Sequence, residues 1–249
     1  MSKAAFSVVL TGPDGAGKSS ITRQLENMLP LPAKRIYMGV NLTSSNLMLP
    51  TTRLWLEIKR ARGKRPDLSG PPGPTRSKIQ PKGIVQVFLT GVKSLLRLGN
   101  RLSEEWFRQV IVWYYQSRGF IILFDRHFFS DYYAYDIANS DQTRPLTSRI
   151  HGFLLNHFYP RPDLFICLDA PAEVLFARKG EGTLEFLEHR RQEYLQLKNV
   201  VENFAVVDAT LAEEEVLRQV ADLILGFQRS RSGQAESWLV SKSKSRWNR

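Results

Sequence analysis

One stretch constrains the fold of this chain more than any other. Residues 12–20 read Gly-Pro-Asp-Gly-Ala-Gly-Lys-Ser-Ser and follow the apolar run Phe6–Thr11. They match the spacing G-x-x-x-x-G-K-S/T. The glycines permit a tight turn whose N–H groups point inward, and the helix expected over Ser19–Leu29 adds its positive dipole end. The sequence therefore predicts a strand, an anion-binding loop and a helix, in this order.

We expect this loop to hold the phosphates of a nucleotide. Lys18 would reach the β- and γ-phosphates, and the Ser19 hydroxyl would ligate Mg²⁺. The predicted nucleotide-binding residues are Gly12, Pro13, Asp14, Gly15, Ala16, Gly17, Lys18, Ser19 and Ser20.

The composition is compatible with a cytoplasmic globular protein. With 249 residues, 43% of them hydrophobic, the chain can form one large α/β domain or two small ones. Its single cysteine, Cys167, excludes a disulfide framework and favours a reducing compartment. Cys167 lies inside an apolar run, so we expect a buried side chain rather than a nucleophile. The N-terminus has no signal-peptide pattern, and no apolar window has the length of a membrane span.

The formal net charge of +11 is concentrated in two segments. Between Arg53 and Arg101 the only acids are Glu57 and Asp67, and the tail from Arg229 is rich in Ser, Lys and Arg. Such charge suits anionic ligands, nucleic acid or an anionic membrane surface, and by itself does not choose among them. The composition of the tail predicts disorder.

Apolar runs typical of buried parallel strands alternate with helical patterns along the chain. This alternation predicts an α/β fold: a three-layer sandwich with a parallel sheet of about five strands and helices on both faces. The expected strands lie at 6–11, 33–38, 120–124, 164–168 and 204–207, and the expected helices at 19–29, 103–117, 146–158, 172–177, 184–200 and 212–227.

A second motif, Asp125-Arg126-His127, follows the apolar run 120–124. Ligands of parallel sheets bind beyond the carboxyl ends of the strands, so Asp125 would lie beside the phosphate loop. There it would hold the Mg²⁺ shell or orient the attacking oxygen, while Arg126 would bind an anionic acceptor. The alternative is that Asp125 caps a helix beginning at Phe128.

Together these segments resemble the thymidylate kinase group of nucleoside monophosphate kinases. The resemblance is carried by GPDGAGKSS (12–20), RGFIILFDRHFFSDYYAYD (118–136), RPDLFICLDAPAEVLFARKGEG (161–182) and VVDAT (206–210). It implies ATP as phosphoryl donor, Mg²⁺ as cofactor, a small-molecule acceptor and a homodimer. The implied catalytic residues are Lys18, Asp125, Arg126 and Arg178, the implied metal ligands are Ser19 and Asp125, and the implied further lid cations are Lys179 with Arg190 or Arg191.

The resemblance also suggests how the chain is organised. We predict a single P-loop kinase domain over 1–228, with a basic acceptor-side insert at 40–102, a lid at 178–190 and the basic tail at 229–249. Within the insert, amphipathic patterns at 52–61 and 84–98 flank a Gly- and Pro-rich loop. The tail is the segment expected to contact nucleic acid or an anionic membrane.

Several departures from the family pattern leave the acceptor open. The segment Tyr37–Asn46 lacks the basic, proline-containing sequence usual after the second strand, and His127 replaces a tyrosine. Arg101 and Arg108 are imperfect candidates for the acceptor-side arginine. The alternatives to a nucleoside monophosphate kinase are a P-loop kinase of a sugar or polyol and a nucleotide-dependent, nucleic-acid-binding ATPase. We expect His151, His157 and His189 to be surface or packing residues.

Overall fold

A computed structural model describes residues 5–39, 45, 47–61, 84–138, 144–180 and 182–231. The chain divides into two compact units. The first comprises Met1–Arg35, Tyr115–Asp125 and Pro162–Arg249, and the second comprises Ile36–Tyr114 and Arg126–Arg161. The tail beyond Arg231, most of the segment 37–46 and the loop between the amphipathic patterns of the insert lie outside the described residues.

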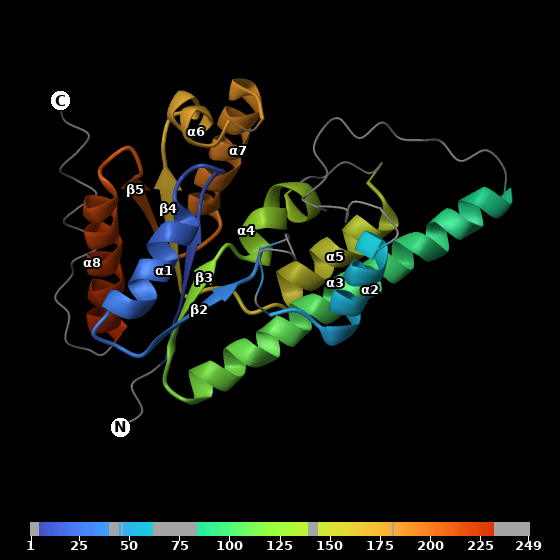
Figure 1. The fold of residues 1–249 in the computed structure, drawn as a ribbon, viewed down its shortest axis with the longest axis horizontal. Coiled ribbons are helices and arrows are strands. Elements are labelled where there is room, and N and C mark those ends of the chain that lie inside the picture. Colours follow the sequence, from blue (N-terminus) through green and yellow to red (C-terminus); the bar gives the residue numbers. More distant parts are fainter. Residues whose placement is uncertain are drawn as a thin grey trace. The chain divides into compact units, whose positions relative to one another are not determined.

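A five-stranded parallel sheet confirms the predicted α/β class (Figure 1). The strand order is β2-β3-β1-β4-β5, so the strand that precedes the glycine loop lies in the centre. Every residue of β1 is buried, as expected for a strand paired on both sides, by β3 and β4. The strands are β1 (Ser7–Thr11), β2 (Ala33–Tyr37), β3 (Ile121–Asp125), β4 (Leu164–Asp169) and β5 (Phe204–Asp208).

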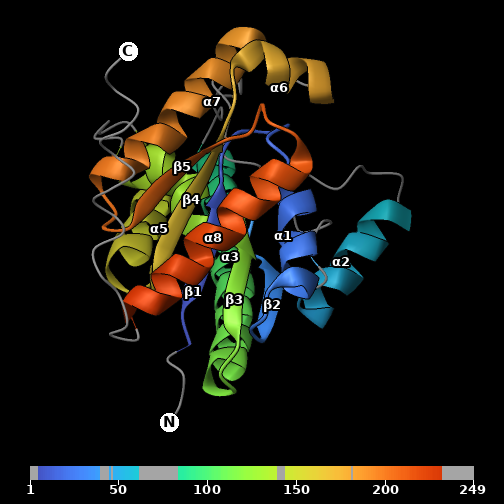
Figure 2. The same ribbon diagram turned by 90° about the vertical axis from the view of Figure 1, so that its left-hand side faces the viewer.

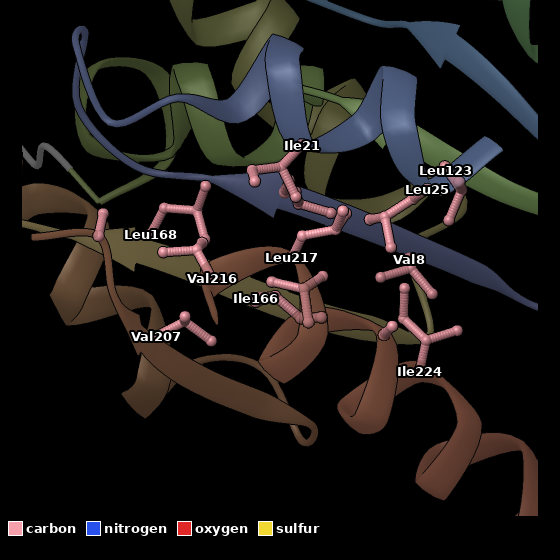
Figure 3. Close-up of a cluster of buried hydrophobic side chains, with 14 of the residues drawn as sticks. Val8, Ile21, Leu25, Leu123, Ile166, Leu168, Val207, Val216, Leu217 and Ile224 are labelled. Carbon is pink, nitrogen blue, oxygen red and sulfur yellow. The ribbon is translucent and has the colours of Figure 1, made fainter. Parts of the chain in front are cut away.

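The core of the first unit lies between the sheet and two helices, α1 and α8. In α8, Val216, Val220, Ile224 and Phe227 recur at helical spacing and form one buried stripe. Figure 2 shows α1 and α8 beside the strands. The close-up in Figure 3 shows apolar side chains of the helices and strands meeting. The helices of this unit are α1 (Lys18–Met28), α6 (Ala172–Lys179), α7 (Leu184–Gln196) with a 3-10 turn at Leu197–Asn199, and α8 (Glu213–Arg231).

The second unit is helical, and its longest element differs from the prediction. The patterns predicted separately at 84–98 and 103–117 form one helix, α3 (Ile84–Ser117), of 34 residues. A glycine in a helix interior costs only about 1 kcal/mol, so Gly99 does not end it. The other helices are α2 (Pro50–Ala61), α4 (Phe128–Tyr132), a π-helical turn η2 (Tyr133–Ile137) and α5 (Leu146–His157). No helix in the described part of the chain is both long and apolar enough to span a bilayer.

Candidate functional site

The glycine loop lies at the carboxyl end of β1, between β1 and α1, as the sequence predicts. Gly12 has φ of +133°, and a Cβ there would lie 2.4 Å from the Leu168 carbonyl oxygen, so only glycine fits. A Cβ at Gly15 would lie 2.7 Å from the carbonyl oxygen of Leu175 in α6. Figures 1 and 2 both place α6 and α7 at this end of the sheet. The loop is thus fixed between β4 and α6.

The Lys18 side chain lies against the main chain of the glycine loop. Its ammonium donates to the carbonyl oxygens of Gly12 (2.7 Å) and Pro13 (2.6 Å), and the side chain is buried. The first turn of α1 contains no acidic residue, which leaves its positive dipole end suited to an anion. Ser19 and Ser20, in the same turn, are exposed.

Asp125 ends β3, and the sheet register pairs it with Leu10, near the start of the glycine loop. The side chain is 1% exposed. Its Oδ2 accepts from Arg35 (3.2 Å), whereas Oδ1 has no hydrogen-bond partner among the described residues. A buried carboxylate oxygen without a partner is costly unless a ligand or water satisfies it.

The competing interpretation, that Asp125 caps the next helix, is wrong. His127 is the N-cap residue of α4, and its Nδ1 accepts from the N–H of Phe129 at 3.2 Å. Burial lowers the pKa of His127 to about 3, so this imidazole is neutral at physiological pH. Asp125 is therefore not committed to capping α4.

The predicted lid cations on α6 and α7 are held by different partners. Arg191 makes a two-pronged bond to Asp169, the last residue of β4, with Nε–Oδ1 at 2.6 Å and Nη2–Oδ2 at 2.9 Å. Arg190 bonds Glu193 and the Tyr194 hydroxyl on its own helix. Arg190 thus pairs within its own helix, whereas Arg191 bonds both Glu188 of α7 and Asp169 of the sheet.

At the end of α6, Arg178 is exposed and donates to the Ala209 carbonyl oxygen (2.8 Å). Its neighbour Lys179 lies 4.0 Å from Asp14 of the glycine loop, with both side chains more than two-fifths exposed. Such an exposed pair contributes little to stability.

Cys167, on β4, is fully buried, as predicted. Burial raises the pKa of its thiol to about 12. Because the thiolate is the nucleophilic form, this residue is unsuited to covalent catalysis.

Arg126, where the chain enters the second unit again after β3, has φ of +69°. It is the one non-glycine residue with positive φ in the described ranges. Its guanidinium is mostly covered, and Nη1 lies 4.0 Å from Asp131 Oδ1. Strained backbone of this kind is concentrated at functional sites, and here it belongs to the residue predicted to bind the acceptor.

The two candidates for the acceptor-side arginine, both on α3, have different surroundings. Arg101 is partly exposed and lies over the Tyr132 ring, 4.8 Å from its centre. Arg108 is 1% exposed and lies over the Phe128 ring at 5.6 Å. Only Arg108 is enclosed by the protein.

A buried polar cluster in the second unit was not predicted. His151 of α5 is fully buried, with Nδ1 at 2.7 Å from Asp136 Oδ2 and Nε2 at 3.0 Å from Glu105 Oε1. Tyr159 donates to the other oxygen of Glu105 at 2.8 Å. Burial acts to lower the pKa of His151, but the hydrogen bonds to Asp136 and Glu105 outweigh it and raise the pKa above 6.5. Protonated His151 therefore links α3, η2 and α5.

This cluster predicts that stability depends on pH. A histidine whose pKa is raised by folding contributes stability that is fully present below the unfolded pKa of 6.5 and is lost as pH rises through the folded pKa. We expect the free energy of unfolding, measured by urea denaturation, to fall as pH rises above 6.5. His151→Gln should remove most of this dependence, and His157→Gln, an exposed histidine on the same helix, should retain it. If the free energy of unfolding fell equally with pH in the wild type and both variants, the dependence could not be assigned to His151.

The strand order and the glycine loop after the central strand define a P-loop kinase-type α/β fold. The chain is 33% identical over 110 residues to a probable thymidylate kinase 1 of Saccharolobus solfataricus, over 42% of this chain and 54% of that protein. It is 27% identical over 117 residues to a thymidylate kinase of Thermosipho africanus, over 43% of this chain and 56% of that protein. The chain thus spans about half the length of these curated relatives.

No protein-family model matches the chain. Over the matched residues, the chain is nevertheless thymidylate kinase-like in sequence.

Proposed function

We propose that this protein is an ATP- and Mg²⁺-dependent phosphotransferase of the thymidylate kinase type, with a nucleoside monophosphate as acceptor. One observation carries the proposal. The glycine loop with Lys18 and the buried carboxylate of Asp125 end neighbouring strands of the same sheet. The named relatives support the reaction class.

The residues at the loop fit a magnesium ion. Asp125 Oδ1 is a buried oxygen without a partner among the described residues, and Ser19 offers an exposed hydroxyl. Mg²⁺ is usually held by one or two such protein oxygens together with substrate phosphates. Bound there, it would neutralise charge on the phosphates of ATP.

Each proposed residue then has a distinct part in the transfer. The ammonium of Lys18 leaves its loop carbonyls for the β- and γ-phosphate oxygens, and the loop N–H groups hold the β-phosphate. Asp125 orients the metal or the attacking oxygen, and Arg126 binds the phosphate of the acceptor. Arg178 supplies a cation to the transferring group, because this reaction depends mainly on positioning and charge stabilisation.

The direct test is an acceptor screen that measures ADP release. The panel contains thymidylate, the other nucleoside monophosphates, and sugars and polyols with their phosphates. We expect ADP release that requires Mg²⁺ and at least one nucleoside monophosphate. Release only with a sugar or polyol would move the protein to another kinase class. Turnover that needs DNA or RNA, and falls steeply with salt, would make it a nucleic-acid-dependent ATPase.

Arg126→Ala should raise the KM for an anionic acceptor at least about tenfold and change kcat less, because a charge-assisted contact to the acceptor is lost. Initial rates at saturating ATP measure both constants. Arg161→Ala removes an arginine of the same unit that bonds Asn156, and should leave the KM unchanged. An Arg126→Ala protein with normal KM would show that the arginine is structural.

A further inference from the structure

Two buried residues of α3, Glu104 and Arg108, lie one helical turn apart in the second unit. They are 3% and 1% exposed. Each uses part of its polar group to hold the chain that follows β2. Glu104 Oε1 accepts from Leu49 N at 3.1 Å, and Arg108 donates from Nε to Leu47 O and from Nη1 to Gly39 O, both at 3.1 Å.

Each residue also has one polar atom left over. Glu104 Oε2 and Arg108 Nη2 have no hydrogen-bond partner among the described residues. They lie 3.8 Å apart, within ion-pair range but too far for a hydrogen bond. Buried polar atoms are rarely left unsatisfied, since each costs about 1–3 kcal/mol. The pair therefore needs a third group.

The chemistry of the two atoms defines that group. It must donate to the carboxylate oxygen and accept from the guanidinium nitrogen, which a water molecule or a ligand hydroxyl does with one oxygen. A phosphate or carboxylate offers only acceptors and would repel Glu104. An ammonium offers only donors and would repel Arg108. The buried Tyr132 hydroxyl also has no hydrogen-bond partner in the described part of the chain.

The pair lies close to the residue proposed to bind the acceptor. Gly39, whose carbonyl oxygen accepts from Arg108, also contacts Arg126: a Cβ at Gly39 would lie 2.7 Å from Arg126 Cδ. A single main-chain segment thus touches both arginines. An acceptor whose phosphate lies on Arg126 would extend toward Glu104 and Arg108 within the same unit.

We infer that Glu104 and Arg108 form a hydroxyl-recognition site that selects acceptors carrying a neutral hydroxyl in addition to a phosphate. The inference deepens the proposed function and rests on it for the role of Arg126. The recognised hydroxyl belongs to a sugar ring, either that of a nucleotide or that of a free sugar phosphate.

Binding calorimetry with matched ligands tests this without requiring turnover. The pairs are uridylate with 2′-deoxyuridylate, thymidylate with 3′-deoxythymidylate, and ribose 5-phosphate with 2-deoxyribose 5-phosphate. In at least one pair the wild-type protein should bind the hydroxylated ligand about tenfold or more tightly than its deoxy form. Preference in a nucleotide pair would assign the hydroxyl to a nucleotide. Preference only in the sugar phosphate pair would assign it to a free sugar phosphate.

Glu104→Gln replaces one carboxylate oxygen with a donor at nearly constant volume. It should reduce the ratio of affinities for the hydroxylated and deoxy ligands to near unity. Glu57→Gln, an exposed glutamate of the same unit, should keep the wild-type ratio. A Glu104→Gln protein that melts normally and keeps the preference would overturn the inference, and so would a wild type that prefers no hydroxylated ligand. If the variant does not fold, the ligand preference of the wild-type protein alone tests the inference.

Turnover is scored separately from binding. Hydroxyl preference without ADP release would reject the proposed kinase and retain the site. ADP release without hydroxyl preference would retain the proposed kinase and reject the hydroxyl-recognition site.

Discussion

Lys18→Ala is expected to lower the rate of phosphoryl transfer at least about 10³-fold, because the ammonium neutralises charge that develops in the transition state. The side chain is buried against the loop, donating to Gly12 O and Pro13 O, so its removal takes a fixed charge from the place where phosphate would lie. ADP release at saturating ATP and acceptor measures the loss.

The loop carbonyls also lose two hydrogen bonds in this variant, so stability must be measured beside activity. Lys18→Met keeps the length of the side chain and should be as inactive as the alanine variant. Lys34→Ala removes a half-exposed lysine of the same unit that pairs with Glu26, and should remain active. Near-normal turnover in a Lys18→Ala protein that melts like wild type would remove the basis of the proposed function.

Asp125→Asn should lower kcat by about 10²-fold or more while changing ATP affinity little, because the carboxylate acts on the metal or the attacking oxygen mainly in the transition state. The substitution preserves volume in a fully enclosed position. Single-turnover rates and equilibrium binding of ATP separate the two effects.

Arg35 makes this experiment interpretable. If Asp125 only pairs with Arg35, then Arg35→Ala should reproduce the loss of activity, and both variants should melt earlier. If Asp125 is catalytic, Arg35→Ala should lose much less. Asp208→Asn, at the end of β5 and bonded to Thr210, is the matched control for a strand-end aspartate. Full kcat in Asp125→Asn would show that the residue is structural.

The sequence predicted the features whose causes are local. The glycine loop depends on main-chain geometry at consecutive positions, and buried strands appear in the sequence as apolar runs. Both could therefore be recognised without knowing which residues lie close together in the fold. The same holds for the burial of Cys167. The extent of α3 was missed because two separate patterns were read on either side of Gly99, although one glycine does not end a helix.

The polar clusters depend on residues far apart in the chain. Glu105, Asp136 and His151 come from three elements, and no spacing within any of them predicts the meeting. The pairing of Arg191 with Asp169 likewise requires α7 to lie along β4. The one local signal was the pair of adjacent glutamates Glu104 and Glu105 on α3. Such a pair resembles the ordinary solvated face of a helix.

The capping role of His127 has a consequence for how pH-dependent kinetics should be interpreted. An imidazole directly after Asp125 and Arg126 invites assignment as the general base that takes the acceptor's proton. Its lone pair at Nδ1 is already engaged by the main chain of α4, and its burial keeps it uncharged across the range of about pH 5 to 8 in which histidines usually titrate. A rate that rises over that interval therefore reports another group, such as the second ionisation of an acceptor phosphate, whose pKa is about 6. The third residue of the motif thus caps α4, and the proposed chemistry rests on the first two.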